Sequence, residues 1–300
     1  MNSRLLAHGL QHFDLVFAQP KRRGTVGDIV LQHLDASVLT ITINRAASKN
    51  SLSMQAARLL QEAIRMAELS PDVRVIIITG SGDSFCSGGD FKNFGAPDPG
   101  DPQAVKWHKE PNWNEIEAKT RRFLLGFEGP RLLHTMAKPT IAMLRGPAVG
   151  AGVGLAAACD FRFLADSAYF LPGYIRVGLS PDYGTSYYVT KLIGPAKARE
   201  LYLLGDKVSA QEALRIGLAT RVVNDADLER ETMEFARRLA DGPPVALQYT
   251  KEAINAAEAR MLEDVLLTEA RNFARCFQTE DAKEAVRAHL EKRAAIFKGR

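Results

Sequence analysis

Two glycine-rich stretches determine how this chain folds: Gly146-Pro147-Ala148-Val149-Gly150-Ala151-Gly152-Val153-Gly154 and Phe85-Cys86-Ser87-Gly88-Gly89-Asp90. Each follows an apolar run typical of a buried strand, 140–144 and 75–79 respectively, and the first opens a helix-like segment at 155–158. Small residues at a strand-to-helix turn let a ligand approach the backbone and leave amide N–H groups free to point at it. Two such turns that face one another can bind one oxygen with two N–H donors, as in an oxyanion hole.

The composition is that of an ordinary globular protein, with 46% hydrophobic and 25% charged residues among 300. A net charge of +4 is too small to indicate nucleic acid and suits an anionic small ligand equally well. No apolar run approaches the roughly 20 residues of a membrane span. The cysteines Cys86, Cys159 and Cys276 are scattered, so we expect a reducing cytoplasm, no structural disulfide and no metal site.

Residues 1–24 hold four basic residues and one acid, Asp14. That charge would suit an organellar presequence, but no small-residue cleavage site follows the short apolar run. We therefore favour a poorly ordered N-terminal extension.

The next part of the chain alternates strands and helices. We expect a β-hairpin over 26–44, a helix over 53–69, a buried strand over 73–79, a proline-rich loop over 96–111 and a helix over 114–137. The glycine turn at 146–154 then lies between strands at 141–144 and 161–164. This alternation predicts an α/β layered core.

From residue 194 onward the pattern is nearly all helical. The expected helices cover 196–204, 210–216, 227–240, 245–258, 261–277 and 280–292. Their apolar faces need a partner surface, which is either the chain's own core or a neighbouring subunit. We therefore divide the chain into the extension (1–24), a core (25–220) and a helical C-terminal region (221–300).

The order of these motifs resembles the crotonase superfamily of enoyl-CoA hydratases and isomerases. The motifs that carry the resemblance are Asn44-Arg45, Asn50-Ser51-Leu52, Phe85 to Lys92, Lys138-Pro139-Thr140-Ile141-Ala142 with the following glycine turn, Cys159-Asp160, Ala165-Asp166-Ser167-Ala168, Ile193 to Ala198, Ala213 to Ala219 and Thr279 to Ala285. The match covers roughly residues 26–300, and its specificity comes from the number and order of the motifs.

The resemblance implies a spiral of repeated ββα units with a C-terminal helical trimerisation region, assembled as a homotrimer or a dimer of trimers. It implies an acyl-CoA thioester as substrate, as in fatty acid metabolism, with coenzyme A as part of the substrate and no separate cofactor. The thioester oxygen would be held by the N–H groups of Gly89 and Ala151. The residues that would contact the substrate or its CoA arm are Arg45, Lys49, Ser87, Gly89, Asp90, Phe91, Lys92 and Gly150.

The chain departs from this pattern at two positions. Hydratases of the family use two glutamates to position and split water, and the matching residues here are Gly154 and Tyr174. Hydration across a double bond needs acid and base groups at those places. The absence of both carboxylates argues against ordinary hydratase activity, although an atypical hydratase stays open.

Asp182, in Ser180-Pro181-Asp182-Tyr183-Gly184, lies where isomerases of the family carry an acidic residue. One carboxylate can remove a proton from one carbon and return it to another, and an apolar pocket can raise the pKa of an Asp toward the working pH. The resemblance thus predicts a double-bond isomerase with Asp182 as proton shuttle. Without the resemblance, the N-cap of a helix that begins at Tyr183 is the favoured role for Asp182.

Two other chemistries remain open. Aryl-CoA dehalogenases and related hydrolases use an Asp at this position as a nucleophile, supported by a ring donor eight residues earlier, where Tyr174 stands. They also need a histidine base, for which His134 is a candidate on the preceding helix. A non-catalytic CoA- or RNA-binding relative is the third class, but no Arg/Lys run with interleaved aromatics supports nucleic acid as a partner.

Overall fold

We describe a computed structural model of the chain, in which residues 28–90 and 100–300 are considered. The expectations for residues 1–24 and for Phe91 and Lys92 lie outside these described residues. The strands are β1 Val30–Asp35, β2 Val38–Ile43, β3 Val75–Gly80, β4 Thr140–Leu144, β5 Pro147–Val149, β6 Phe161–Ala165, β7 Tyr169–Leu171, β8 Val208–Ser209 and β9 Arg221–Val223. The α-helices are α1 Met54–Leu69, α2 Pro102–His108, α3 Ile116–Gly126, α4 Glu128–Thr135, α5 Ala151–Ala157, α6 Thr185–Leu204, α7 Ala210–Arg215, α8 Leu228–Ala240, α9 Pro244–Ala259, α10 Leu262–Phe277 and α11 Glu280–Leu290.

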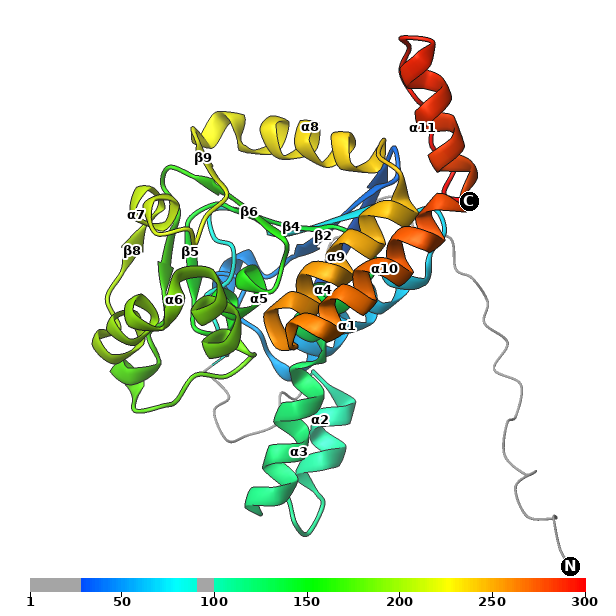
Figure 1. Ribbon diagram of the computed structural model, residues 1–300. Coiled ribbons are helices and arrows are strands. Elements are labelled where there is room, and N and C mark those ends of the chain that lie inside the picture. The colour runs from blue at the N-terminus through cyan, green and yellow to red at the C-terminus, as the bar shows by residue number, and fades with distance from the viewer. Residues whose placement is uncertain (1–27, 91–99) are drawn as a thin grey trace, which may run out of the picture.

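A six-stranded sheet in the order β1-β2-β3-β4-β6-β9 forms the centre of the fold (Figure 1). The β1–β2 hairpin is antiparallel and each further pair in this sheet is parallel. Strand β3 is buried along nearly its whole length because its run of β-branched residues is covered on both faces. A smaller sheet, β5-β7-β8, lies beside it. This mixed α/β architecture confirms the predicted fold class.

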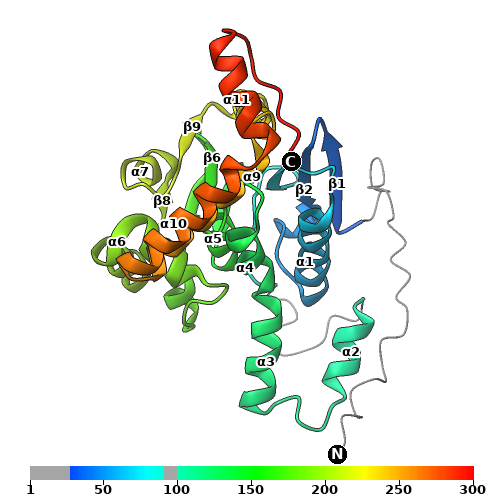
Figure 2. The ribbon, with the colours of Figure 1, turned by 45° about the vertical axis from the view of Figure 1, so that its right-hand side comes forward.

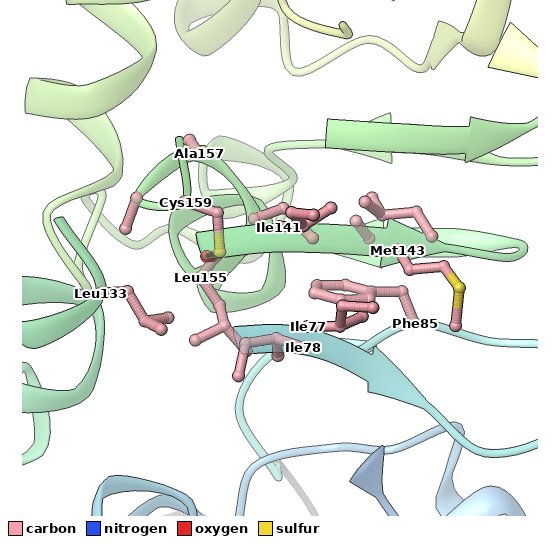
Figure 3. Close-up of a cluster of buried hydrophobic side chains, with 14 of the residues drawn as sticks. Ile77, Ile78, Phe85, Leu133, Ile141, Met143, Leu155, Ala157 and Cys159 are labelled. Atoms are coloured by element: carbon pink, nitrogen blue, oxygen red, sulfur yellow. Dashed lines mark hydrogen bonds between the residues drawn. The ribbon is translucent and has the colours of Figure 1, made fainter. Parts of the chain in front are cut away.

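Helices cover both faces of the large sheet. Helix α8 crosses one face, where the rings of Phe161 and Phe163 meet Phe235 at 4.9 and 5.1 Å between centroids. Helices α1 and α5 pack on the other face. Figure 3 shows the buried side chains between β3, β4 and α5, with Phe85, Ile77 and Leu155 among them. The site described below therefore rests on a dense apolar core.

The C-terminal helices form a separate layer. Helices α9 and α10 lie side by side, and α11 projects away from the body of the molecule (Figures 1 and 2). Lys251 of α9 reaches the core, where its ammonium donates to Asp160 Oδ2 at 2.8 Å and to the carbonyl of Leu133 at 2.9 Å. Helix α9 thus docks on its own chain, while α10 exposes Leu266, Phe273 and Phe277.

Several predicted elements differ from the structure. Part of the expected 96–111 loop is helix α2, because Asp101 caps it and Pro102 occupies its first turn, where a proline is tolerated. The expected helix over 114–137 is two helices, α3 and α4, which meet at Phe127. Helix α6 begins at Thr185 and continues through a kink at Gly194. None of the helices in residues 28–90 and 100–300 combines the length and apolar character that a membrane span requires.

Candidate active site

The two glycine turns lie against one another. The Cys86 N–H donates to the Pro147 carbonyl at 3.1 Å and the Val149 N–H donates to the Cys86 carbonyl at 2.8 Å. A Cβ placed on Gly88, whose φ is +88°, would lie 2.9 Å from the carbonyl oxygen of Val149 and 3.7 Å from the amide nitrogen of Ala151. The turns can approach this closely only because Gly88 has no side chain.

The first turn is held in place from its other side. Leu52 donates its N–H to the Gly88 carbonyl at 2.8 Å and accepts from the Asp90 N–H at 3.1 Å. In a ladder of this kind, the N–H of the residue between them, Gly89, points away from Leu52. Gly89 is exposed, and a Cβ there would meet nothing within 4 Å. The turn therefore presents an open backbone position.

Asn50, for which the sequence predicted no side-chain role, stabilises the segment that leads into this turn. Its side-chain amide donates to the carbonyls of Ser81 and Ser84 at 2.9 and 2.6 Å, and its Oδ1 accepts from the Arg45 N–H at 2.9 Å. Its φ is +57°, a left-handed conformation that Asn adopts more readily than most residues. Its type and its conformation therefore both suit this place.

Neither candidate donor is bound to another group of residues 28–90 and 100–300. Within the described part of the chain, the N–H groups of Gly89 and Ala151 donate to no protein acceptor. The neighbouring Gly150 N–H, by contrast, donates to the Leu171 carbonyl at 3.0 Å. Ala151 is the first residue of α5, where a backbone N–H has no intrahelical partner. Both groups are thus available to a ligand oxygen.

Tyr174 connects the second turn to Asp182. A Cβ on Gly150 would lie 3.8 Å from the Tyr174 ring, and the Tyr174 hydroxyl donates to Asp182 Oδ1 at 2.7 Å. Tyr174 is 8% exposed, so its phenol is buried. Tyr174 lies in a short 3₁₀ turn that ends at Gly178, whose φ of +69° reverses the chain and returns Asp182 to the ring.

Burial raises the pKa of the Asp182 carboxyl, while the hydrogen bond from Tyr174 opposes that rise. Burial, together with the nearby Asp182 charge, raises the pKa of Tyr174. The phenol therefore stays protonated at neutral pH and can donate to Asp182. A carboxyl with a raised pKa that touches one fixed donor is suited to taking up and returning a proton.

The capping alternative for Asp182 is wrong. Helix α6 begins at Thr185, and its N-cap residue is Gly184, which has no side chain to accept a hydrogen bond. Tyr183 lies outside the helix with a φ of +55°, and its ring meets Phe127 edge-on at 5.6 Å. The carboxylate of Asp182 is bound by Tyr174 instead of by the helix.

Gly154 packs against Thr185 and Tyr183, which leave no room for a side chain. A Cβ there would lie 2.6 Å from Thr185 Oγ1 and 2.9 Å from the Tyr183 carbonyl oxygen. Thr185 itself, which the sequence analysis missed, is fully buried. A threonine in the first turn of a helix carries no sequence signal that separates it from an ordinary helix start.

The residues expected along the CoA arm have distinct surroundings. Arg45 is paired with Asp90 at 2.8 Å and also donates to Ser51, whereas Lys49 is exposed. The Ser87 hydroxyl donates to the Ser48 carbonyl at 3.2 Å. Arg45 and Asp90 therefore lie together, as do Ser87 and the 48–49 backbone, and the charge of Arg45 is already balanced.

Cys86 and His134 do not join this group. Burial raises the pKa of the Cys86 thiol to about 12, which agrees with a packing role. His134 contacts the rings of Tyr187 and Tyr188, and its Nε2 lies 3.9 Å from a Glu258 carboxylate oxygen. It lines a pocket of about 290 Å³ at the other end of α5, which none of Gly89, Ala151, Tyr174 and Asp182 lines.

This chain is similar to known proteins over most of its length. Residues 33–122 and 125–300 match the family model described as enoyl-CoA hydratase/isomerase. The chain is 32% identical to the short-chain-enoyl-CoA hydratase of Clostridium acetobutylicum, covering 88% of this chain and 95% of that protein. It is 31% identical to the 1,2-epoxyphenylacetyl-CoA isomerase of Escherichia coli, covering 91% and 99%.

Solved structures give the same result. The crystal structure of the enoyl-CoA hydratase from Bacillus anthracis superposes with a TM-score of 0.82 at 29% identity, covering 91% of this chain and all of that one (100%). An enoyl-CoA hydratase structure from Geobacillus kaustophilus has a TM-score of 0.79 at 33% identity, covering 91% of this chain and 99% of that one. The chain therefore belongs to the enoyl-CoA hydratase/isomerase family of the crotonase superfamily.

Proposed function

We propose that this chain is an acyl-CoA isomerase that shifts a double bond by moving a proton through Asp182. The observation that carries the proposal is the 2.7 Å hydrogen bond from the buried Tyr174 hydroxyl to Asp182 Oδ1. This bond links the Asp182 carboxyl, whose pKa is raised, to Tyr174, whose ring packs against the glycine turn that precedes Ala151. In the proposed reaction, Asp182 takes the α-proton of an enoyl thioester, the bonding electrons move to the thioester oxygen, and Asp182 returns the proton to the γ-carbon.

The N–H groups of Gly89 and Ala151 would stabilise the negative charge on that oxygen. Their availability supports this role, since neither has a partner within the described residues. Each such donor lowers a barrier by about 3–4 kcal/mol when it is aimed at developing charge.

Packing around Gly154 supports isomerisation over hydration. A glutamate at this position would need the space that Thr185 Oγ1 and the Tyr183 backbone fill. Tyr174, at the second position, is a donor to Asp182 and carries no carboxylate. The two groups that would activate water in a hydratase are therefore replaced by a hydrogen-bonded cluster around one carboxyl.

The remaining expectations belong to the same proposal. The CoA arm would be surrounded by Arg45, Lys49, Ser87, Asp90, Phe91, Lys92 and Gly150. The exposed apolar side chains of α10 would meet neighbouring subunits in a homotrimer or a dimer of trimers. The mass of the particle in light scattering separates these two assemblies from a monomer.

Nucleophilic attack by Asp182 is the second candidate, because the Tyr174 donor would suit that chemistry too. The histidine base that such a reaction needs is not supplied by His134, whose ring faces Glu258, Tyr187 and Tyr188. Proton transfer therefore accounts for more of the observed contacts.

The test is exchange of acyl-CoA protons with D2O, which needs no knowledge of the natural acyl group. Phenylacetyl-CoA and 3-hexenoyl-CoA would be incubated with the protein and followed by NMR. Asp182→Asn should reduce exchange by about 10²–10⁴-fold while binding of butyryl-CoA persists. Unchanged exchange would contradict the proposal, and an aspartyl adduct found by mass spectrometry would favour the nucleophilic candidate.

A further inference from the structure

The Thr185 side chain contacts both the Tyr174 hydroxyl and the main chain of Asp182. Its Oγ1 is 3.0 Å from the Tyr174 hydroxyl oxygen and 2.5 Å from the main-chain carbonyl oxygen of Asp182. That carbonyl also accepts the Thr185 backbone N–H at 2.9 Å. Because the side chain is 0% exposed, its hydroxyl must find both its donor and its acceptor inside the protein.

Counting hydrogens shows what this arrangement allows. Each hydroxyl has one hydrogen to donate and lone pairs with which to accept. When Asp182 is ionised, Tyr174 must donate to it, while Thr185 donates to the main-chain carbonyl of Asp182. When Asp182 is protonated, it can donate to Tyr174, Tyr174 to Thr185, and Thr185 still to the Asp182 carbonyl. Protonation thus turns the Tyr174 hydrogen from the carboxylate to Thr185 while the heavy atoms stay in place.

We propose that Thr185 is a positioning residue that accepts the Tyr174 hydrogen when Asp182 is protonated and so keeps the Asp182 carboxyl in one place in both of its protonation states. The inference rests on the proposed function, in which Asp182 must alternate between those states during each turnover. Buried networks stabilise a site in this way only when every member is satisfied.

The space for the Thr185 hydroxyl depends on Gly154. A Cβ at that position would lie 2.6 Å from Thr185 Oγ1, which is shorter than the contacts of real Cβ atoms. Gly154 and Thr185 are therefore a matched pair: a side chain at residue 154 and the hydroxyl in its present place exclude one another. The absence of a carboxylate at residue 154 and the presence of the Thr185 hydrogen bonds therefore depend on the same packing.

The Thr185 hydroxyl favours the neutral form of Asp182, because only in that form does the Tyr174 hydrogen need Thr185 as its acceptor. Removing the Thr185 hydroxyl leaves that hydrogen without an acceptor when Asp182 donates to the Tyr174 oxygen. The pKa of Asp182 should then fall. The titratable groups that face this carboxyl are Tyr174 and the adjacent Tyr183.

The test compares Thr185→Val, which keeps the shape, with Thr185→Ser, which keeps the hydroxyl. Exchange of phenylacetyl-CoA protons with D2O would be measured across pH in the full chain. Thr185→Val should lower the exchange rate about tenfold and move its acidic limb to lower pH, with little change in KM. Thr185→Ser should restore both to within about twofold of the starting protein.

A double-mutant cycle separates positioning from stability. If Thr185 acts through Tyr174, adding Thr185→Val to Tyr174→Phe should cause no further loss. A normal pH profile in Thr185→Val, or a full additional loss in the double variant, would overturn the inference. Should Thr185→Val not fold, Thr185→Ala takes its place with the same expectations. Asp182→Asn is measured in parallel: if it keeps full exchange, the proposed function itself fails, whereas its inactivity beside a normal Thr185→Val rejects only the role of Thr185.

Discussion

The Tyr174 hydroxyl lies 2.7 Å from Asp182 Oδ1, and the two residues are eight positions apart in the chain. This contact exists because the chain reverses at Gly178 and the helix after Asp182 does not begin until Thr185. It places a half-buried carboxyl beside the glycine turn that carries Ala151. That placement is what the proposed proton transfer requires, beside the Gly89 and Ala151 N–H groups that are proposed to bind the oxyanion.

Removing the phenol hydroxyl should shift the pH dependence of the reaction. The Tyr174 hydrogen bond lowers the pKa of Asp182, whereas burial raises it. Tyr174→Phe removes the lowering contribution, so the pKa of Asp182 rises and its basic form appears only at higher pH. The acidic limb of the kcat/KM profile should move upward by about one pH unit. An acidic limb that stays in place or moves downward would rule out this hydrogen bond as a determinant of the Asp182 pKa.

Adding a methyl group at Gly154 should destabilise the protein. Its Cβ would lie 2.6 Å from Thr185 Oγ1 and 2.9 Å from the Tyr183 carbonyl oxygen. Overpacking of this kind costs about 1–3 kcal/mol, so Gly154→Ala should lower the midpoint of thermal unfolding. Gly126→Ala is the matched control, since a Cβ there meets nothing within 4 Å. Equal midpoints for the two variants would show that the space between Gly154 and Thr185 is larger than described.

Lys251 should be needed to dock the C-terminal helices. Its ammonium, on a side chain that is 10% exposed, donates to Asp160 Oδ2 and to the carbonyls of Leu133 and Lys138. Breaking a buried pair by removing one partner costs about 3–5 kcal/mol, and the partial exposure of Asp160 places this pair at the lower end. Lys251→Met should therefore lower the urea midpoint.

Lys197→Met provides the comparison for Lys251→Met, because Lys197 forms a surface pair with Glu200 at 2.8 Å. Exposed pairs contribute little, so this variant should unfold at the urea concentration of the unmodified protein. Helix α9 would not depend on Lys251 for docking if both lysine variants unfolded at the same concentration.

Most helices and strands were predictable from local pattern. The hairpin, helix α1 and the helices from α7 onward follow apolar periodicity, and their ends agree with the expected bounds to within a few residues. Helix α2 was missed because four prolines in 96–111 suggested a loop, although Pro102 only begins the helix. The start of α6 was misplaced because Tyr183 has a left-handed backbone and lies outside the helix, where its ring contacts Phe127, a residue distant in sequence.

The site was predictable to a different degree at each residue. The glycine-rich pattern predicted free backbone donors at both turns. In the structure, the N–H groups of Gly89 and Ala151 have no partners among the described residues. The pairing of Arg45 with Asp90 and the burial of Thr185 were not predictable, because both depend on segments that meet only in the folded chain.

The most direct test of the central claim removes a single N–H group from the proposed oxyanion site. Ala151 is the first residue of α5, a position at which proline is tolerated, and its N–H has no partner within the described residues. Ala151→Pro should keep the unfolding midpoint but reduce exchange of phenylacetyl-CoA protons with D2O by about 100- to 1,000-fold, whereas Ala151→Gly, which retains the N–H, should exchange nearly as fast as the unmodified protein. A folded Ala151→Pro variant with unchanged exchange would contradict the account.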